Sequence, residues 1–255
     1  MKTDTNPNSS LIERLFSAGA HFGFTKSRRH PTVRPYIFGT KNGTDIFDLE
    51  KTAELLQKAK DVLTEAGKNG KIVVCVSTKD ETSALVTEAA KRVGLPYVTN
   101  RWIGGMMTNW TEIKKRLARL AELAREAESG ELERKYTKKE RVVIGREVDK
   151  LTFNFGGIRD TERTPDMMLV VDPRHDVIAV REAIEMKIPV VAITSSDNNL
   201  AHVTYPVVVN DTLQPSVALV LNELIDAYAA GKAQYTPKPA PARTGAPRAR
   251  TPRAA

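Results

Sequence analysis

The chain has very little cysteine and no long apolar run. Cys75 is the single cysteine among 255 residues, which excludes an internal disulfide framework and a zinc site with several cysteine ligands. No apolar stretch approaches the roughly 20 residues of a membrane-spanning helix. The polar N-terminal sequence MKTDTNPNSS has no apolar core of a secretion signal. We therefore expect a cytoplasmic protein without membrane contact.

The motifs of common catalytic sites are also missing. The sequence has no G-x-G-x-x-G after an expected strand, no G-x-x-x-x-G-K loop and no G-x-S-x-G turn. Its four histidines lack the spacing of a metal-binding helix. Cys75 lies among valines, where a thiol behaves as a small inert hydrophobe. The sequence predicts no catalysis, no cofactor and no metal ligand.

The net charge of +8 is unevenly distributed. Six of the 39 basic residues and no acid lie in residues 232–255, which leaves 33 basic against 31 acidic residues before them. The body is therefore nearly balanced, and any nucleic-acid contact by it must come from local patches. The tail is rich in Pro, Ala and Arg, and we expect it to be disordered.

Short apolar stretches alternate with amphipathic ones along most of the chain. We expect strands at 44–49, 71–77, 96–99, 166–171, 189–194 and 206–209, with helices at 11–17, 49–67, 78–94, 176–187 and 214–231. Continuous β-branched runs such as KIVVCVS are typical of strands buried on both faces of a parallel sheet. The pattern predicts an α/β fold with a doubly wound, mostly parallel sheet.

Several residues are expected to mark the ends of these helices. Asp48 has the position of an N-cap, and Thr78 with Glu81 has the spacing of a capping box. Pro215 lies near the start of the last helix. Three helices are expected to stop at glycines: the helix at 49–67 at Gly67 and Gly70, the helix at 78–94 at Gly94, and the helix at 214–231 at Gly231.

Between the strands at 96–99 and 166–171, apolar residues repeat at the spacing of a coiled coil. The first series is Met106, Trp110, Ile113, Leu117, Leu120, Ala124 and Ala127. After a polar turn, Thr137 and Glu140 form a second capping box, and the second series is Ile144, Val148, Leu151 and Phe155. These series predict an antiparallel coiled-coil hairpin inserted into the sheet domain.

The stretch NRWIGGMMTNW, residues 100–110, holds both tryptophans of a chain in which aromatics are only 6%. Trp110 lies on the predicted seam and is expected to pack at the base of the hairpin. Trp102 has two interpretations: it wedges the sheet against the hairpin, or it faces a partner. Gly104 and Gly105 allow a sharp turn between strand and helix.

Cations are concentrated in two parts of the body. The irregular segment 26–41 carries no acid and five cations: Lys26, Arg28, Arg29, Arg34 and Lys41. Such a segment can follow a phosphate backbone, and the alternative is a solvated basic loop. On the hairpin, cations cluster at Lys114, Lys115, Arg116 and Arg119, then at Lys135, Lys138, Lys139 and Arg141. An exposed coiled-coil face also accounts for much of that pattern.

A second class of function uses polar loops at the carboxyl ends of the expected strands. Asp172 and His175 follow one strand and Asp197 follows the next, at the edge where doubly wound sheets bind small ligands or substrates. The simpler interpretation is that Asp172 ends its strand and Asp176 caps the following helix. We expect 1–105 and 157–231 to form the sheet domain, 106–156 the hairpin and 232–255 the tail.

From about residue 10 to 230 the chain resembles the bacterial-type family of small-subunit ribosomal protein S2. The matching stretches are AGAHFG (18–23), RPYIFGTKNGTDIFDLEKT (34–52), NRWIGGMMTNW (100–110), TKKE (137–140), FGGIRD (155–160) and PDMMLVVDPRHDVIAVREA (165–183). Several unusual combinations occur in the family's order. The chain has three departures from the family. Many relatives have histidine at the position of Phe24 and an Asp-rich loop where this chain reads SSDNNLAHVTYPVVVND (195–211), and the lost imidazole puts a metal in doubt. The third departure is a basic tail in place of an acidic one.

The resemblance implies a flavodoxin-like sheet domain with a protruding coiled-coil hairpin and no catalysis. It implies a structural component of the small ribosomal subunit that contacts rRNA and neighbouring ribosomal proteins. Where an organism has it, the mRNA-binding small-subunit protein one is a further implied partner, and the basic tail suggests an altered contact with it. The implied rRNA contacts are Lys26, Arg28, Arg29, Arg34, Lys41, Arg101, Trp102, Asn109, Lys114, Lys115, Arg116, Lys138 and Lys139.

Overall fold

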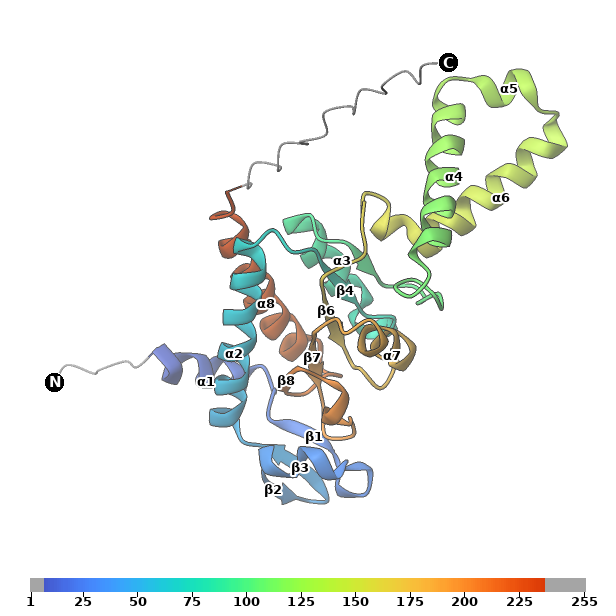
Figure 1. The fold of residues 1–255 in the computed structure, drawn as a ribbon. Coiled ribbons are helices and arrows are strands. Elements are labelled where there is room, and N and C mark those ends of the chain that lie inside the picture. Colours follow the sequence, from blue (N-terminus) through green and yellow to red (C-terminus); the bar gives the residue numbers. More distant parts are fainter. Residues whose placement is uncertain (1–6, 237–255) are drawn as a thin grey trace, which may run out of the picture.

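A computed structural model of the chain describes residues 7–236, with side chains from residue 10. Its centre is a five-stranded parallel sheet in the order β5-β4-β6-β7-β8 (Figure 1). The strands are β4 (Val73–Val76), β5 (Tyr97–Val98), β6 (Met167–Val171), β7 (Val190–Thr194) and β8 (Tyr205–Val208). Counted along the chain, this is the 2-1-3-4-5 order of flavodoxin-like doubly wound sheets. The predicted α/β class and parallel sheet are confirmed.

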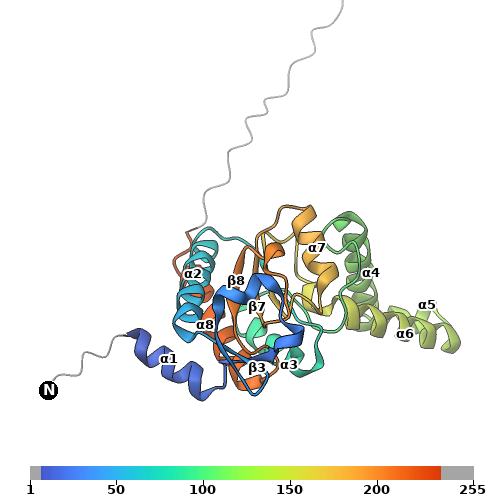
Figure 2. The same cartoon turned by 90° about the horizontal axis from the view of Figure 1, so that it is seen from below.

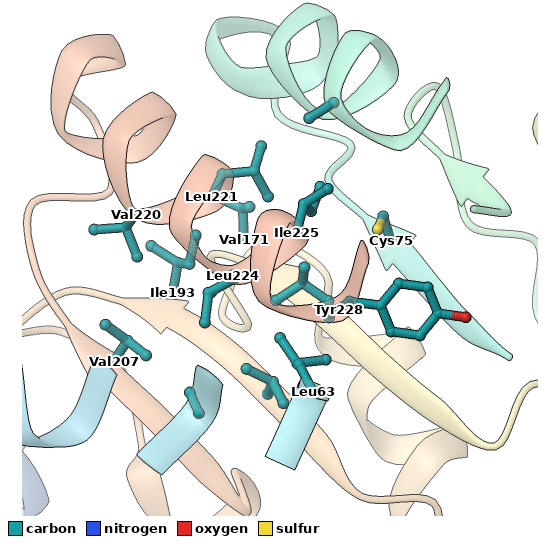
Figure 3. Close-up of a cluster of buried hydrophobic side chains, with 14 of the residues drawn as sticks. Leu63, Cys75, Val171, Ile193, Val207, Val220, Leu221, Leu224, Ile225 and Tyr228 are labelled. Atoms are coloured by element: carbon teal, nitrogen blue, oxygen red, sulfur yellow. The ribbon is translucent and has the colours of Figure 1, made fainter. Parts of the chain in front are cut away.

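Helices cover both faces of the sheet, because alternate residues of each strand point to opposite sides. Val73 and Cys75 of β4 belong to a core shared with α2 (Leu49–Lys68), α3 (Asp80–Val93) and α8 (Gln214–Lys232). Figure 3 shows this core, where Leu63 of α2 meets side chains of α8 and the sheet. Val74 and Val76 face a second core, which includes α7 (Val177–Glu185) and the region around Trp102.

The N-terminal part forms a small sheet that the sequence did not predict. After α1 (Pro7–Ser17), strands β1 (Phe22–Thr25), β2 (Ile37–Lys41) and β3 (Thr44–Phe47) pair antiparallel in the order β1-β3-β2. Two 3-10 helices, η1 (Lys26–Arg28) and η2 (Pro31–Tyr36), connect β1 to β2. The strand expected at 44–49 therefore exists, but in this sheet. Figure 2 shows the small sheet in front of β7 and β8.

The segment expected to form a coiled-coil hairpin contains α4 (Trp110–Glu128), a short α5 (Glu131–Lys135) and α6 (Lys138–Phe155). These helices protrude from the sheet domain (Figure 1). The first series is buried at Ile113, Leu117 and Leu120. Farther along, Leu123 and Glu126 are buried while Ala127 is exposed, so the last part of the predicted seam is wrong. A helix without supercoil drifts about 20° per heptad relative to a strict seven-residue repeat.

Four of the expected helix ends are confirmed, and one of them is Pro215 in the first turn of α8. Asp48 Oδ1 accepts hydrogen bonds from the backbone N–H groups of Glu50 and Lys51. Glu140 Oε2 accepts from the backbone N–H and the hydroxyl of Thr137, at 2.8 and 2.9 Å. Gly94 ends α3 in the left-handed conformation with φ of 67°.

The capping box at Thr78 is wrong, and Asp176 has the predicted N-cap position of α7 without a capping bond. The helix after β4 begins at Asp80, and Thr78 donates its backbone N–H and its hydroxyl to the carboxylate of Asp176, at 3.0 and 2.6 Å. Asp176 precedes α7 but makes no side-chain bond to that helix. The two loops meet because parallel strands β4 and β6 are neighbours. Burial raises the pKa of Asp176.

Gly67 and Gly231 lie inside their helices, contrary to the predicted stops. α2 continues to Lys68 and α8 to Lys232. A Cβ atom at Gly231 would lie 2.1 Å from the carbonyl oxygen of Thr64, and one at Gly67 would lie 2.5 Å from that of Tyr228. The two glycines therefore allow the backbones of α2 and α8 to approach closely.

None of the helices within 7–236 is long and apolar enough to cross a membrane. Most of the expected tail, 237–255, and the first six residues lie outside the described part of the chain.

Candidate nucleic-acid interface

Four of the five cations in the segment 26–41 are held at the surface by the small sheet and its 3-10 helices. Lys26 and Arg28 belong to η1, Arg34 to η2, and Lys41 ends β2. All four are exposed, and none forms an ion pair with a described residue. The Arg28 guanidinium lies 5.9 Å from the centre of the Phe24 ring. These side chains keep their full charge available for an anion.

Arg29 differs from its neighbours because its charge is already neutralised. Its Nε donates to Asp45 Oδ2 at 2.7 Å, and its Nη2 donates to Thr40 Oγ1 at 2.9 Å and to Asp45 Oδ1. The Asp45 side chain is completely buried. Hydrogen bonds from Arg29 lower the pKa of Asp45 most strongly, in spite of its burial. Arg29 therefore ties the loop at η1 to β3, and removal of it would disturb the fold.

The loop 100–109 exposes two of its candidate residues and buries the third. Arg101 and Asn109 are exposed. Trp102 is 7% exposed and donates its indole N–H to Glu182 Oε1 at 3.2 Å. Its position agrees with the wedge interpretation, and its ring is not available for stacking on a base. Trp110 packs partly buried against the same core, as expected.

Glu182 of α7 organises this loop. Besides the Trp102 indole, its carboxylate accepts the backbone N–H groups of Gly105 at 2.7 Å, Met107 at 3.0 Å and Thr108 at 3.4 Å. The turn at Gly104 and Gly105, which has φ of 89° at Gly105, brings these donors to one carboxylate. The carboxylate thus satisfies the backbone groups that the turn leaves unpaired before α4.

The cations of the protruding helices fall into free and paired groups. Four candidates are exposed without an ion pair among the described residues: Lys114, Arg116, Lys138 and Lys139. Lys115 pairs with Glu112 at 2.6 Å. Acids also neutralise three neighbours that the sequence grouped with these candidates, Arg119, Lys135 and Arg141. The free cations are therefore fewer than the sequence suggests.

The structure does not gather all the candidates into one patch. The small sheet with Lys26, Arg28, Arg34 and Lys41 lies at one end of the sheet domain, and helices α4, α5 and α6 lie at the other (Figure 1). Figure 2 shows the same separation from below. A ligand that contacts both groups must therefore span the molecule.

The polar loops of the alternative site meet at the carboxyl ends of the parallel strands. Lys79 Nζ lies 3.5 Å from Asp172 Oδ2, and Arg174 Nη1 lies 2.6 Å from Asp197 Oδ2. Burial and the charge of Asp172 raise the pKa of Asp211 to about 7. His175 is exposed at this edge. Within residues 7–236, no group of three or more His, Cys, Asp or Glu side chains could hold a metal ion.

The residues that sequence reasoning missed are the buried acids Asp45, Glu182 and Asp211. The partners of Glu182 lie 74 to 80 residues away in the sequence, so no local spacing marks them. The one local signal was the Gly-Gly pair, which indicated a turn whose donors need an acceptor.

Comparison with known proteins gives consistent matches over most of the chain. The family model for ribosomal protein S2 matches residues 15–231. The chain is 39% identical over 226 residues to small ribosomal subunit protein uS2 of Picosynechococcus sp., covering 89% of this chain and 88% of the relative. It is 38% identical to uS2 of Dictyoglomus thermophilum, over 87% of this chain and 90% of the relative. It is also 38% identical to small ribosomal subunit protein uS2c of Rhodomonas salina, over 86% of this chain and 90% of the relative.

Proposed function

The chain belongs to the ribosomal protein S2 family, whose members are structural and not enzymatic, and we propose that it binds rRNA as a component of the small ribosomal subunit. The relatives named above carry small-subunit names, which supports the subunit assignment. The function does not require the polar loops at Asp172, His175 and Asp197 to act on a substrate.

The observation that carries the RNA-binding part is the set of exposed, unpaired cations on the small sheet. Lys26, Arg28, Arg34 and Lys41 lie on one compact unit, are exposed, and form no ion pair with a described residue. Phosphate groups would release counterions when they contact such side chains. Arg29 is excluded from the direct contacts and instead supports the unit through Asp45.

A second contact region includes the loop and the protruding helices. Arg101 and Asn109 are exposed beside the start of α4, and the free cations Lys114, Arg116, Lys138 and Lys139 follow on α4 and α6. We assign Lys115 a weaker role because Glu112 pairs with it, and we assign Trp102 a packing role. Residues 106–156 act in this proposal as an inserted coiled-coil arm between the two parts of a sheet domain, 1–105 and 157–231.

Protein partners complete the proposal. Neighbouring small-subunit proteins would contact the faces left free by RNA. Protein one, where it is present, would be a further partner whose contact with the basic tail, 232–255, differs from that of relatives with acidic tails.

The test is the salt dependence of binding to transcribed small-subunit rRNA. The variant with both Arg28→Ala and Arg34→Ala should bind more weakly, because each lost phosphate contact reduces the slope of log K against log salt by about 1. Filter binding over a range of KCl concentrations measures both the affinity and the slope. Circular dichroism should show an unchanged fold, since neither side chain has a partner that it neutralises.

The matched control removes the same charge elsewhere. Arg92 and Arg163 are exposed and already pair with Asp226 and Asp166, at 2.6 and 2.8 Å. The variant with Arg92→Ala and Arg163→Ala should retain the wild-type slope. Equal losses in both double variants, or none in the first, would contradict the assignment of the small sheet.

A further inference from the structure

A groove lies between α7 and the loop that follows β7, at the edge where doubly wound sheets place their ligands. Its volume is about 470 Å³. Val177, Val180 and Ile184 of α7 form its apolar side. Val177 is 40% exposed and Ile184 is 44% exposed, so both offer apolar surface to a ligand. We call this feature the α7 groove, and Figure 1 shows α7 beside β6 and β7.

One residue that lines the α7 groove carries a buried amide without a hydrogen-bond partner among the described residues. Asn198 is 1% exposed and lines the groove. Neither its Nδ2 nor its Oδ1 is bonded to any described residue. A buried amide without partners is costly. One free donor and one free acceptor on the same side chain match the C=O and N–H groups of a peptide backbone.

The charge at the rim is a single free cation. Arg174 lines the groove but is neutralised by Asp197 at 2.6 Å. Arg181 lies on α7 between Val177 and Ile184, is exposed, and has no ion pair in the part of the chain described. The rim therefore favours one carboxylate next to apolar side chains.

We propose that the α7 groove binds an extended peptide segment of another protein, with apolar side chains and a carboxylate. Apolar side chains would cover Val177 and Ile184, the carboxylate would pair with Arg181, and the backbone would bond to Asn198. An RNA ligand fits less well, because the rim has one free cation among the described residues, whereas an RNA backbone presents a phosphate at every nucleotide. This inference goes beyond RNA binding. It rests on the proposed function only for the place where the partner is found, which is the small ribosomal subunit.

The test places a photo-crosslinking amino acid at Ile178, which is 54% exposed on α7 and does not line the groove. The full chain carrying p-benzoylphenylalanine at this position is expressed in cells, irradiated and fractionated on a sucrose gradient. Every fraction is scored for adducts, and adducts are sequenced by mass spectrometry. We expect a ribonuclease-resistant adduct whose crosslinked peptide combines apolar side chains with Asp, Glu or a C-terminal carboxylate.

Variants then show whether the adduct depends on the groove. Arg181→Glu and Asn198→Ala should each lower the yield at least about tenfold, as expected when a central contact of a small interface is lost. Glu185→Ala, on an exposed part of the same helix, should leave the yield unchanged. Thermal unfolding of the purified variants checks that each is folded.

Four results would overturn the proposal: a ribonuclease-sensitive adduct, an adduct with a second copy of this chain, a yield insensitive to Arg181→Glu in folded protein, or no adduct. Gradient position separates this result from the proposed function. Protein that enters the small subunit without a peptide adduct would contradict the α7 groove alone, whereas protein that stays at the top would contradict the subunit assignment.

Discussion

The guanidinium of Arg29 lies against a carboxylate with no solvent exposure, while the adjacent Arg28 faces solvent. Arg29→Ala should lower the free energy of unfolding by about 3–5 kcal/mol, because Asp45 would remain as a buried unpaired charge. Arg28→Ala should change it by less than about 0.5 kcal/mol, as for an ordinary surface position. Urea denaturation of the two variants measures both values. Similar values for the pair would contradict the structural role of Arg29.

Glu182 has a comparable role at the other side of the sheet. Glu182→Ala should lower the free energy of unfolding by about 3–5 kcal/mol, since it leaves the buried N–H groups of Trp102 and Met107 without an acceptor at roughly 1–3 kcal/mol each. The exposed Glu185 on the same helix is the matched control, and Glu185→Ala should cost less than about 0.5 kcal/mol. A loss below about 1 kcal/mol for Glu182→Ala in urea denaturation would show that the loop 100–109 finds other acceptors.

Asp211 predicts a pH dependence of stability. Its pKa is raised from 3.8 to about 7, so the folded state holds a proton that the unfolded state has released between these values. Stability from this group is therefore fully present below pH 3.8 and is lost as the pH rises towards 7, by up to about 4 kcal/mol. The Asp211→Asn variant should not show this loss. The difference between its free energy of unfolding and that of the wild type should therefore increase in favour of the variant from pH 5 to pH 8.

Urea denaturation at the two pH values measures this difference. Asp160→Asn, at a side chain that is 94% exposed, should differ from wild type by less than about 0.5 kcal/mol at both. A difference for Asp211→Asn that stays constant or falls with pH would mean that Asp211 is ionised in the folded protein.

At the scale of elements, the closest contact is that between α2 and α8. Gly231→Ala should lower the free energy of unfolding by about 2–3 kcal/mol, because the added methyl group would overlap the carbonyl of Thr64 and force the helices apart. Gly145 lies in α6 with nothing within 4 Å of a Cβ atom. Gly145→Ala should therefore stabilise the protein by roughly 0.5–1 kcal/mol. Thermal or urea unfolding of the two variants tests whether the changes in the free energy of unfolding have opposite signs. Stabilisation by both substitutions would contradict this packing.

The elements that could be predicted are those whose pattern is local. β4, β6 and β7 are short β-branched runs between amphipathic helices, and their sequence alone indicates a parallel sheet. The small sheet escaped prediction because β1 and β2 are short and partly exposed, and because the segment that connects them contains Pro31 and Pro35. Arg28 and Lys41, two of the candidate contacts, are exposed, and a charge run without acids was enough to select them.

Contacts between distant residues could not be predicted in this way. The acceptor for the Trp102 indole lies 80 residues away on α7, and Asp176 meets Thr78 only because β4 and β6 are adjacent. Local spacing suggested a capping box at Thr78, and a buried carboxylate from the neighbouring loop replaced it. The same limit applies to Arg29, whose sequence context matches that of Arg28 although its partner is buried.

At the scale of the whole molecule, the candidate cations of the small sheet and those of the protruding helices lie at two separated ends of a body with a nearly balanced charge. Such a distribution suits a large folded RNA that contacts several surfaces of one protein, and it does not suit a single narrow binding groove. Because the contacts are separated, loss of one group of cations should weaken the binding of the protein to RNA without abolishing it. Each group should contribute its own share of the salt dependence.

The central claim is that RNA holds this protein in the small ribosomal subunit. The most direct measurement is a sucrose gradient of native lysate, in which the protein is followed by immunoblot with and without prior ribonuclease. We predict that it sediments with the small subunit in the untreated lysate and moves to the top after ribonuclease. A peak at the top of both gradients would contradict the claim.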